Sequence, residues 1–241
     1  PFGARGANSG VQDTDNLIWK LRLVMDGRAP DRLLDSYSDE RVLAAEENIV
    51  NSTRSTDFIT PKSKVSRSFR DAVLELSRTL PFAQGLVNSG RLSDPAVLTD
   101  SSLNTPDSDA FQGDMVPGAV AEDAPVRVGA REQWLLDYTG GRFTAIYYAG
   151  ETATIDAATS AGLGSLATQA ITVDAIVVAE RANTADGVHC LVDAQGLFVK
   201  RYDARPGTTY LLRPDQHVTA RWRSFDPEQV KSAVRRATCN L

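Results

Sequence analysis

The fold of this chain is decided by FTAIYYA at residues 143–149, a small-residue stretch at 157–167, and ITVDAIVVA at 171–179. The first and third stretches are rich in β-branched, aromatic and other apolar residues, which is typical of strands buried in a sheet. The stretch between them favours a helix. A strand–helix–strand order predicts that the two strands run parallel.

The residues that follow extend this pattern. Two further strands are predicted, TTYLL at 208–212 and a second at 217–222, on either side of Pro214-Asp215. A last helix is expected after Asp226, with Pro227 in its first turn. A short helix is expected upstream at 133–138. Residues 125–241 are therefore predicted to form an α/β domain in which a parallel pair and a hairpin share one sheet with helices on both faces.

The N-terminal part of the chain follows a different rhythm. Apolar residues recur at helical spacing over 11–25, 31–54 and the stretch after Pro61, so residues 1–92 are predicted to be helical. Residues 93–124 are rich in Ser, Asp, Pro and Gly, and 100–124 carry six acidic side chains and no basic one. That composition predicts an acidic linker between two domains.

Composition argues against several classes of protein. The net charge of −5 comes from the acidic segment, and neither flank is basic enough to favour nucleic acid. No apolar run approaches the roughly 18 residues of a membrane span. The cysteines, Cys190 and Cys239, share no CxxC spacing, which favours reduced thiols and a cytoplasmic location. With His189 and His217 as its histidines, the chain offers no zinc or iron site, and both are interpreted as structural.

The first ten residues, PFGARGANSG, carry the strongest chemical signal. Gly3 and Gly6 let the backbone pass close to a ligand, and Asn8 opens a helix whose N-terminal N–H groups suit an anion. By spacing alone, a tight turn with a capping residue explains the loop equally well. The chain starts with Pro1 rather than Met, so we expect it to be cut from a larger protein.

The wider string changes this balance. PFGARGANSG, with the following Gln12-Asp13, Asn16-Leu17 and Trp19-Lys20-Leu21, closely resembles the flavin-contacting P-x-G-x-G-x-N segment of class A flavoprotein monooxygenases. The stretch LDSYSDER at 34–41 is similar to the family's L-x-x-Y-x-x-E-R helix. NSGRLS at 88–93, and RPGT with LRPD between 205 and 215, resemble the 3-(3-hydroxyphenyl)propionate hydroxylase and polyketide hydroxylase branch of this class, which also includes phenol hydroxylase.

This resemblance implies a function for the intact protein. It would use NADPH or NADH to reduce FAD, form a C4a-hydroperoxyflavin with O2, and hydroxylate a phenolic or other aromatic substrate. The resemblance assigns the contacts with the pyrimidine edge of the flavin to Pro1, Gly3, Gly6, Ala7 and Asn8, and it assigns no catalytic residue. The N-terminal FAD-binding region that it implies, with G-x-G-x-x-G, is missing here, so the chain alone is expected to be inactive.

The resemblance also implies that 125–241 form a thioredoxin-like domain. The overall fold class is then α/β: a helical remnant of an FAD-binding domain at 1–92, followed by this domain. Thiol exchange needs a reactive thiolate and a resolving partner, and the absent CxxC disfavours a thiol oxidoreductase. Where thioredoxins carry a cis-proline the chain has Arg205-Pro206, and we predict a cis bond there. The alternative function is a non-catalytic module that pairs subunits into a homodimer.

Overall fold

A computed structural model describes residues 5–87, 95–151, 154–182 and 188–241, with the side chain of Arg5 left aside. The chain divides into two compact units. One, the helical unit, combines the N-terminal residues up to Thr14 with residues 40–96. The other, the sheet unit, combines Asp15–Asp39 with Val97–Leu241.

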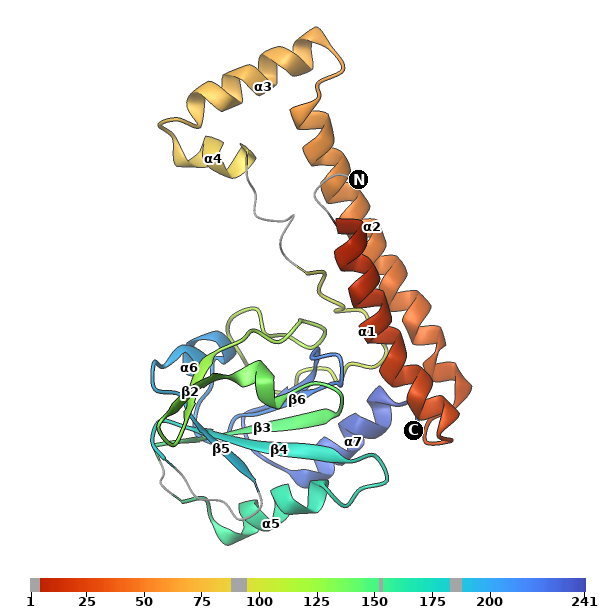
Figure 1. Ribbon diagram of the computed structural model, residues 1–241, viewed down its shortest axis with the longest axis vertical. Coiled ribbons are helices and arrows are strands. Elements are labelled where there is room, and N and C mark those ends of the chain that lie inside the picture. Colours follow the sequence, from red (N-terminus) through yellow and green to blue (C-terminus); the bar gives the residue numbers. More distant parts are fainter. Residues whose placement is uncertain (1–4, 88–94, 152–153, 183–187) are drawn as a thin grey trace. The chain divides into compact units, whose positions relative to one another are not determined.

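Helices make up the regular structure of the N-terminal 87 residues, as the sequence predicted. They are α1 (Arg5–Met25), the 3-10 turn η1 (Asp31–Leu33), α2 (Asp35–Ile59), α3 (Lys64–Leu76) and α4 (Pro81–Val87) (Figure 1). Gly27, at a φ of 66°, ends α1 in the left-handed conformation that glycine adopts without strain. The side chain of Ser63 caps α3 by accepting a hydrogen bond from the Ser66 N–H.

The sheet unit is built on one mixed sheet of seven strands in the order β2-β1-β5-β4-β3-β6-β7. Its strands are β1 (Pro125–Val128), β2 (Arg131–Trp134), β3 (Phe143–Gly150), β4 (Val173–Ala179), β5 (His189–Val192), β6 (Thr209–Leu212) and β7 (Val218–Trp222). Its further helices are the 3-10 turn η2 (Leu135–Tyr138), α5 (Ala157–Leu166), α6 (Leu197–Tyr202) and α7 (Pro227–Ala237).

The centre of this sheet confirms the predicted topology. Strands β3 and β4 are parallel, with Ile146 opposite Ile176, and β6 pairs antiparallel with β3 and with β7. The order β4-β3-β6-β7, with α5 joining the parallel pair and α7 after the hairpin, places the parallel pair and the hairpin in one sheet, as predicted. Asp226 caps α7 and Pro227 stands in its first turn, as predicted.

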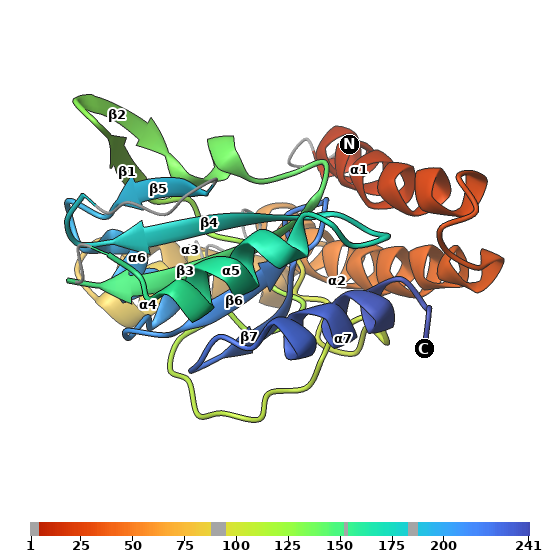
Figure 2. The same cartoon turned by 90° about the horizontal axis from the view of Figure 1, so that it is seen from below.

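Two apolar layers cover the faces of the sheet. Helices α5 and α7 lie on one face of the sheet (Figure 2). Together with the end of α1 they contribute to a core that includes Trp19, Phe143 and Val230. On the other, α6 and the chain before β1 enclose Ile146, Tyr148 and their neighbours. Burial on both sides explains why β3 is apolar along nearly its whole length instead of alternating.

Three expectations differ from the structure. The predicted helix at 133–138 is the end of β2 followed by η2. The peptide bond before Pro206 is trans, because the described residues contain no cis bond. Residues 97–124, predicted to belong to a linker, pack in the sheet unit. The composition was misleading because the few apolar residues of this segment, such as Leu98 and Leu103, are fully buried.

The segment 97–124, which we call the acidic strap, joins the sheet through its backbone. The Gly118 N–H donates to the Val218 carbonyl at 2.7 Å, and the Thr105 N–H donates to the Thr219 carbonyl at 2.8 Å. Gly118 has a φ of 96°, and a Cβ there would lie 2.4 Å from the Leu98 carbonyl. Since no side chain fits in that space, glycine is required where the strap crosses itself.

Candidate functional site

The residues predicted to contact the flavin lie at the start of α1, within the helical unit. Gly6, Ala7 and Asn8 form its first turn and are exposed, whereas Pro1 and Gly3 lie outside the described residues. The first four N–H groups of a helix have no partner within the helix. A Cβ added at Gly6 would meet no atom within 4 Å. This turn therefore offers backbone donors and open space.

The second half of α2 lies beside this turn. Asn48 donates a hydrogen bond to the Ser9 hydroxyl at 3.2 Å, and the Arg41 guanidinium contacts the Asp13 carboxylate at 2.6 Å. Next to these contacts is a groove of about 480 Å³. It is lined by Gly6, Ser9, Ala45, Asn48, Ile49, Ser52, Thr53, Thr56, Asp57 and Lys62. The lining contains both polar and apolar residues, and it includes Gly6, one of the residues predicted to contact flavin.

The other end of α1 belongs to the sheet unit and is held by a buried carboxylate, Asp215. Asn16 and the Trp19 indole N–H each donate to Asp215 Oδ2 at 3.1 Å. The Arg213 guanidinium donates to both carboxylate oxygens, at 3.0 and 2.8 Å, and is itself fully buried. We call these four residues the Asp215 cluster.

Electrostatics explain why a charged carboxylate is tolerated at this depth. Burial by itself would raise the pKa of Asp215, but Arg213 and His217 outweigh burial and hold that pKa far below its usual range. His217 lies with its Nδ1 3.3 Å from Asp215 Oδ1. The prediction that His217 has a structural role agrees with this position. Sequence reasoning noted the motif Arg213-Pro214-Asp215 but did not foresee its contact with α1.

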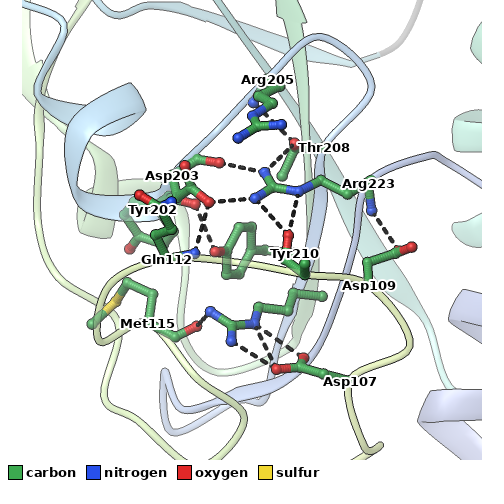
Figure 3. Close-up of polar contacts among 12 residues, drawn as sticks. Asp107, Asp109, Gln112, Met115, Tyr202, Asp203, Arg205, Thr208, Tyr210 and Arg223 are labelled. Atoms are coloured by element: carbon green, nitrogen blue, oxygen red, sulfur yellow. Dashed lines mark hydrogen bonds and ion pairs between the residues drawn. The ribbon is translucent and has the colours of Figure 1, made fainter.

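A second polar cluster, formed by the residues around Arg221 and Arg223, holds the acidic strap against β7, and we call it the strap cluster. The Arg221 guanidinium makes three hydrogen bonds to Asp107, the shortest at 2.7 Å, and a fourth to the Met115 carbonyl. Arg223 pairs with Asp203 (Figure 3). The Phe111 ring lies close to both guanidinium groups, with its centroid 4.5 Å from Arg221 and 3.7 Å from Arg223. Such cation–π contacts add to the ion pairs, so the strap is fixed by charge as well as by its apolar residues.

These contacts perturb the ionisable groups of the strap cluster. Burial alone would raise the pKa of Asp203, but the Gln112 N–H and Arg223 lower it overall (Figure 3). Burial raises the pKa of Tyr210 to about 12, and the nearby Arg221 opposes that rise. At neutral pH Asp203 is therefore ionised and the Tyr210 hydroxyl is protonated, as is usual for these groups. The strap cluster has a structural role: it holds the acidic strap on the sheet.

The end of β3, where the resemblance to thioredoxins predicts the position of an active-site motif, lies against Pro206. Strand β3 ends at Gly150, and a Cβ there would lie 2.7 Å from Pro206 Cγ. Cys190 lies on β5 and donates its thiol to the Val188 carbonyl at 3.7 Å, and Cys239 follows α7. In the described ranges no three His, Cys, Asp or Glu side chains are grouped to hold a metal, and no helix is both long and apolar enough to cross a bilayer.

Two family models match the chain. Residues 1–52 match the FAD binding domain family and residues 118–237 match the HcaD C-terminal domain family. The 3-(3-hydroxy-phenyl)propionate/3-hydroxycinnamic acid hydroxylase 2 of Burkholderia vietnamiensis (strain G4 / LMG 22486) is 26% identical over 97% of this chain and 46% of its own length. The 4-methyl-5-nitrocatechol 5-monooxygenase of a Burkholderia species is 29% identical over 99% of this chain and 41% of its own.

A solved structure has the same fold. The flavin-dependent monooxygenase PieE, in complex with FAD and substrate, aligns with a TM-score of 0.73 at 21% identity. That alignment covers 99% of this chain and 45% of PieE. Along nearly its whole length the chain is thus similar to proteins named as aromatic hydroxylases and monooxygenases. It spans under half the length of the curated relatives it matches.

Proposed function

We propose that this chain is part of an FAD-dependent monooxygenase that uses NADH or NADPH and hydroxylates a phenolic or other aromatic substrate. The observation that carries the proposal is the similarity to aromatic hydroxylases along nearly the whole chain, together with a match to the FAD binding domain family that includes the first turn of α1.

The first turn of α1 fits a contact with flavin. Its residues Gly6, Ala7 and Asn8 are exposed, and the N–H groups of a helix start are free to donate. The partial positive charge of a helix N-terminus stabilises negative charge placed beside it. Pro1 and Gly3 belong to the same proposed contact by their resemblance to the family segment. When bound, FAD supplies the redox and oxygen chemistry; the chain's own residues orient its ring and stabilise the charge of its reduced form.

Other parts of the proposal go with this function. An upstream FAD-binding region completes the cofactor site, residues 1–92 belong to the FAD-binding domain, and 125–241 form a redox-inactive thioredoxin-like domain. A homodimer and a cytoplasmic location are proposed with it. Light scattering of the protein at high concentration tests the dimer, and a strict monomer would remove that part alone.

A flavin titration tests the central proposal. We expect the full reading frame that contains these residues to purify with FAD, and the 241-residue chain to leave FAD fluorescence unquenched. In the full protein, Asn8→Pro removes one of the backbone N–H groups of the first turn, where proline is tolerated, so FAD binding should weaken by about tenfold, the effect of losing one hydrogen bond to a charged group. Arg67→Ala, a change in α3 outside the motif, is the control. A full-length protein that binds no flavin would overturn the proposal.

A further inference from the structure

The sheet unit contains a cleft whose lining includes none of the residues proposed to contact flavin. It runs between α7, the approach to β4, and the turn that follows α1, and its volume is about 480 Å³. Pockets that bind small molecules commonly have about 300–1,000 Å³. We call it the α7 cleft; its lining residues are Gly27, Arg28, Gln169, Ala170, Ile171, Val173, Lys231, Val234, Arg235, Thr238 and Asn240.

The floor of the α7 cleft is aliphatic. Val173 and Val234 are buried, at 1% and 6% exposure, and Ile171 is half-buried beside them. The Thr238 hydroxyl at the same floor is already used, since it donates to the Val234 carbonyl at 2.8 Å. Among the described residues that line the cleft, none is aromatic. This surface suits a flexible hydrocarbon chain better than a flat ring.

The rim of the α7 cleft is basic. Arg28, Lys231 and Arg235 line it, and none of the described lining residues is acidic. Lys231 is paired with Glu228 at 2.7 Å, while the Arg235 guanidinium is exposed and has no described partner. In a chain with a net charge of −5, three cations gathered at one apolar cleft make it complementary to an anion.

A neighbouring pocket of about 340 Å³ extends the basic character. It shares Arg28 and Ile171 with the α7 cleft and adds Arg22 and Arg142 to the lining. Their carboxylate partners are loosely held: Asp26 lies 3.7 Å from Arg22, and Asp174 lies 3.4 Å from Arg142. Exposed ion pairs of this kind contribute little and are screened by solvent. Arg28 therefore lines two neighbouring pockets that both carry positive charge, the α7 cleft and the pocket of about 340 Å³.

The walls of the α7 cleft are tied together. The Arg28 guanidinium donates to the Ala170 carbonyl, and Asn240 Nδ2 donates to the Arg28 carbonyl at 2.9 Å. These bonds join the turn after α1 to the approach to β4 and to the end of α7. The cleft is therefore formed before any ligand arrives, which lowers the cost of binding.

We propose that the α7 cleft binds a free aliphatic carboxylate. The hydrocarbon chain lies on Ile171, Val173 and Val234, and the carboxylate is bound by Arg28 and Arg235. This site is separate from the proposed flavin contact, and it does not depend on the monooxygenase proposal. Arginine is suited to the role because its planar guanidinium can donate two parallel hydrogen bonds to one carboxylate.

Isothermal titration calorimetry with sodium octanoate tests the proposal on the 241-residue chain, with 1-octanol as the uncharged probe. Octanoate should bind at one saturable site and octanol at least about tenfold more weakly, because it cannot pair with the arginines. The double variant Arg28→Gln/Arg235→Gln should weaken octanoate binding by about tenfold and leave octanol binding unchanged. Arg236→Gln, an exposed neighbour outside the lining, is the matched control.

A second variant keeps the test independent of charge. Ala170→Trp places a large side chain in the cleft from an exposed turn, so the fold should persist while octanoate binding is lost; far-UV circular dichroism checks the fold. The proposal is overturned if octanoate shows no saturable binding, if octanol binds as tightly, if Arg236→Gln weakens binding as much as the double variant, or if Ala170→Trp folds and still binds.

Discussion

The two ends of helix α1 differ in their solvent exposure and in the contacts that their side chains make. The first turn, with Gly6, Ala7 and Asn8, is exposed and has open space beside its glycine. The later turns carry Asn16 and Trp19, which are buried at 1% and 6% exposure and donate to one carboxylate, Asp215. One continuous helix thus has an end free for a ligand and an end committed to the sheet.

This difference separates function from stability within a single element. A residue in the first turn can be changed at little cost to folding, because it loses no buried contact. A residue in the Asp215 cluster cannot, because its partners would keep buried charge or unsatisfied donors. Substitutions at the two ends should therefore affect different measurements.

The largest expected effect is on the buried end. Asp215→Ala removes the carboxylate that accepts two hydrogen bonds from the fully buried Arg213, so we expect the free energy of unfolding to fall by about 3–5 kcal/mol. Urea denaturation measures it. Asp174→Ala is the matched control, since the exposed Asp174–Arg142 pair should contribute under about 1 kcal/mol. Equal losses from the two variants would contradict the assigned importance of the cluster.

A smaller effect should follow removal of one donor. Trp19→Phe keeps an aromatic ring against Phe143 but deletes the indole N–H that contacts Asp215. Because hydrogen bonds to charged groups contribute about 1.5–3 kcal/mol, we expect a loss of about 2 kcal/mol in thermal or urea unfolding. Trp134→Phe, at a position 52% exposed, should change stability by less than about 0.5 kcal/mol. A neutral Trp19→Phe would show that the indole bond is dispensable.

Acid should loosen the same end by a smaller amount. The pKa of Asp215 is depressed in the folded protein, so the unfolded chain takes up the proton first as the pH falls. The contribution of ionised Asp215 to the free energy of unfolding is complete above the unfolded pKa of about 3.9 and is lost as the pH falls towards the lower folded pKa. Between pH 5 and pH 3 this loss amounts to about 1 kcal/mol. Urea midpoints across this range measure the slope. Asp215→Asn should be less stable at neutral pH but should show a shallower acid slope, and an unchanged slope would assign the acid sensitivity to other groups.

The smallest effect on stability is expected at the exposed end. Asn8→Ala should change the free energy of unfolding by less than about 0.5 kcal/mol, because no buried contact is lost and alanine favours helix. The same urea experiment as for Asp215→Ala gives the comparison. A loss above about 1 kcal/mol would show that the first turn is structural and would remove the contrast between the two ends.

Much of the sheet unit could be predicted from the sequence because its strands are long, apolar and separated by turn residues. The pattern of 143–149 and 171–179 identified β3 and β4 within two residues at either end. Short elements were missed: β1, β5 and α6 have four to six residues each, too few to show a period. The helix expected at 133–138 is present only over its last four residues, as η2, because its first two residues complete a hairpin whose partner, β1, had not been recognised.

The sequence by itself determined the helical start, the order of the central strands and the resemblance of residues 1–10 to a flavin-contacting segment, because these are local patterns of a few adjacent residues. Tertiary structure alone decided the path of the acidic strap and the partners of Asp215. Arg221 meets Asp107 across 114 positions and Asn16 meets Asp215 across 199. Such contacts leave no periodic trace, because each depends on one side chain being brought to another by the folding of everything between them.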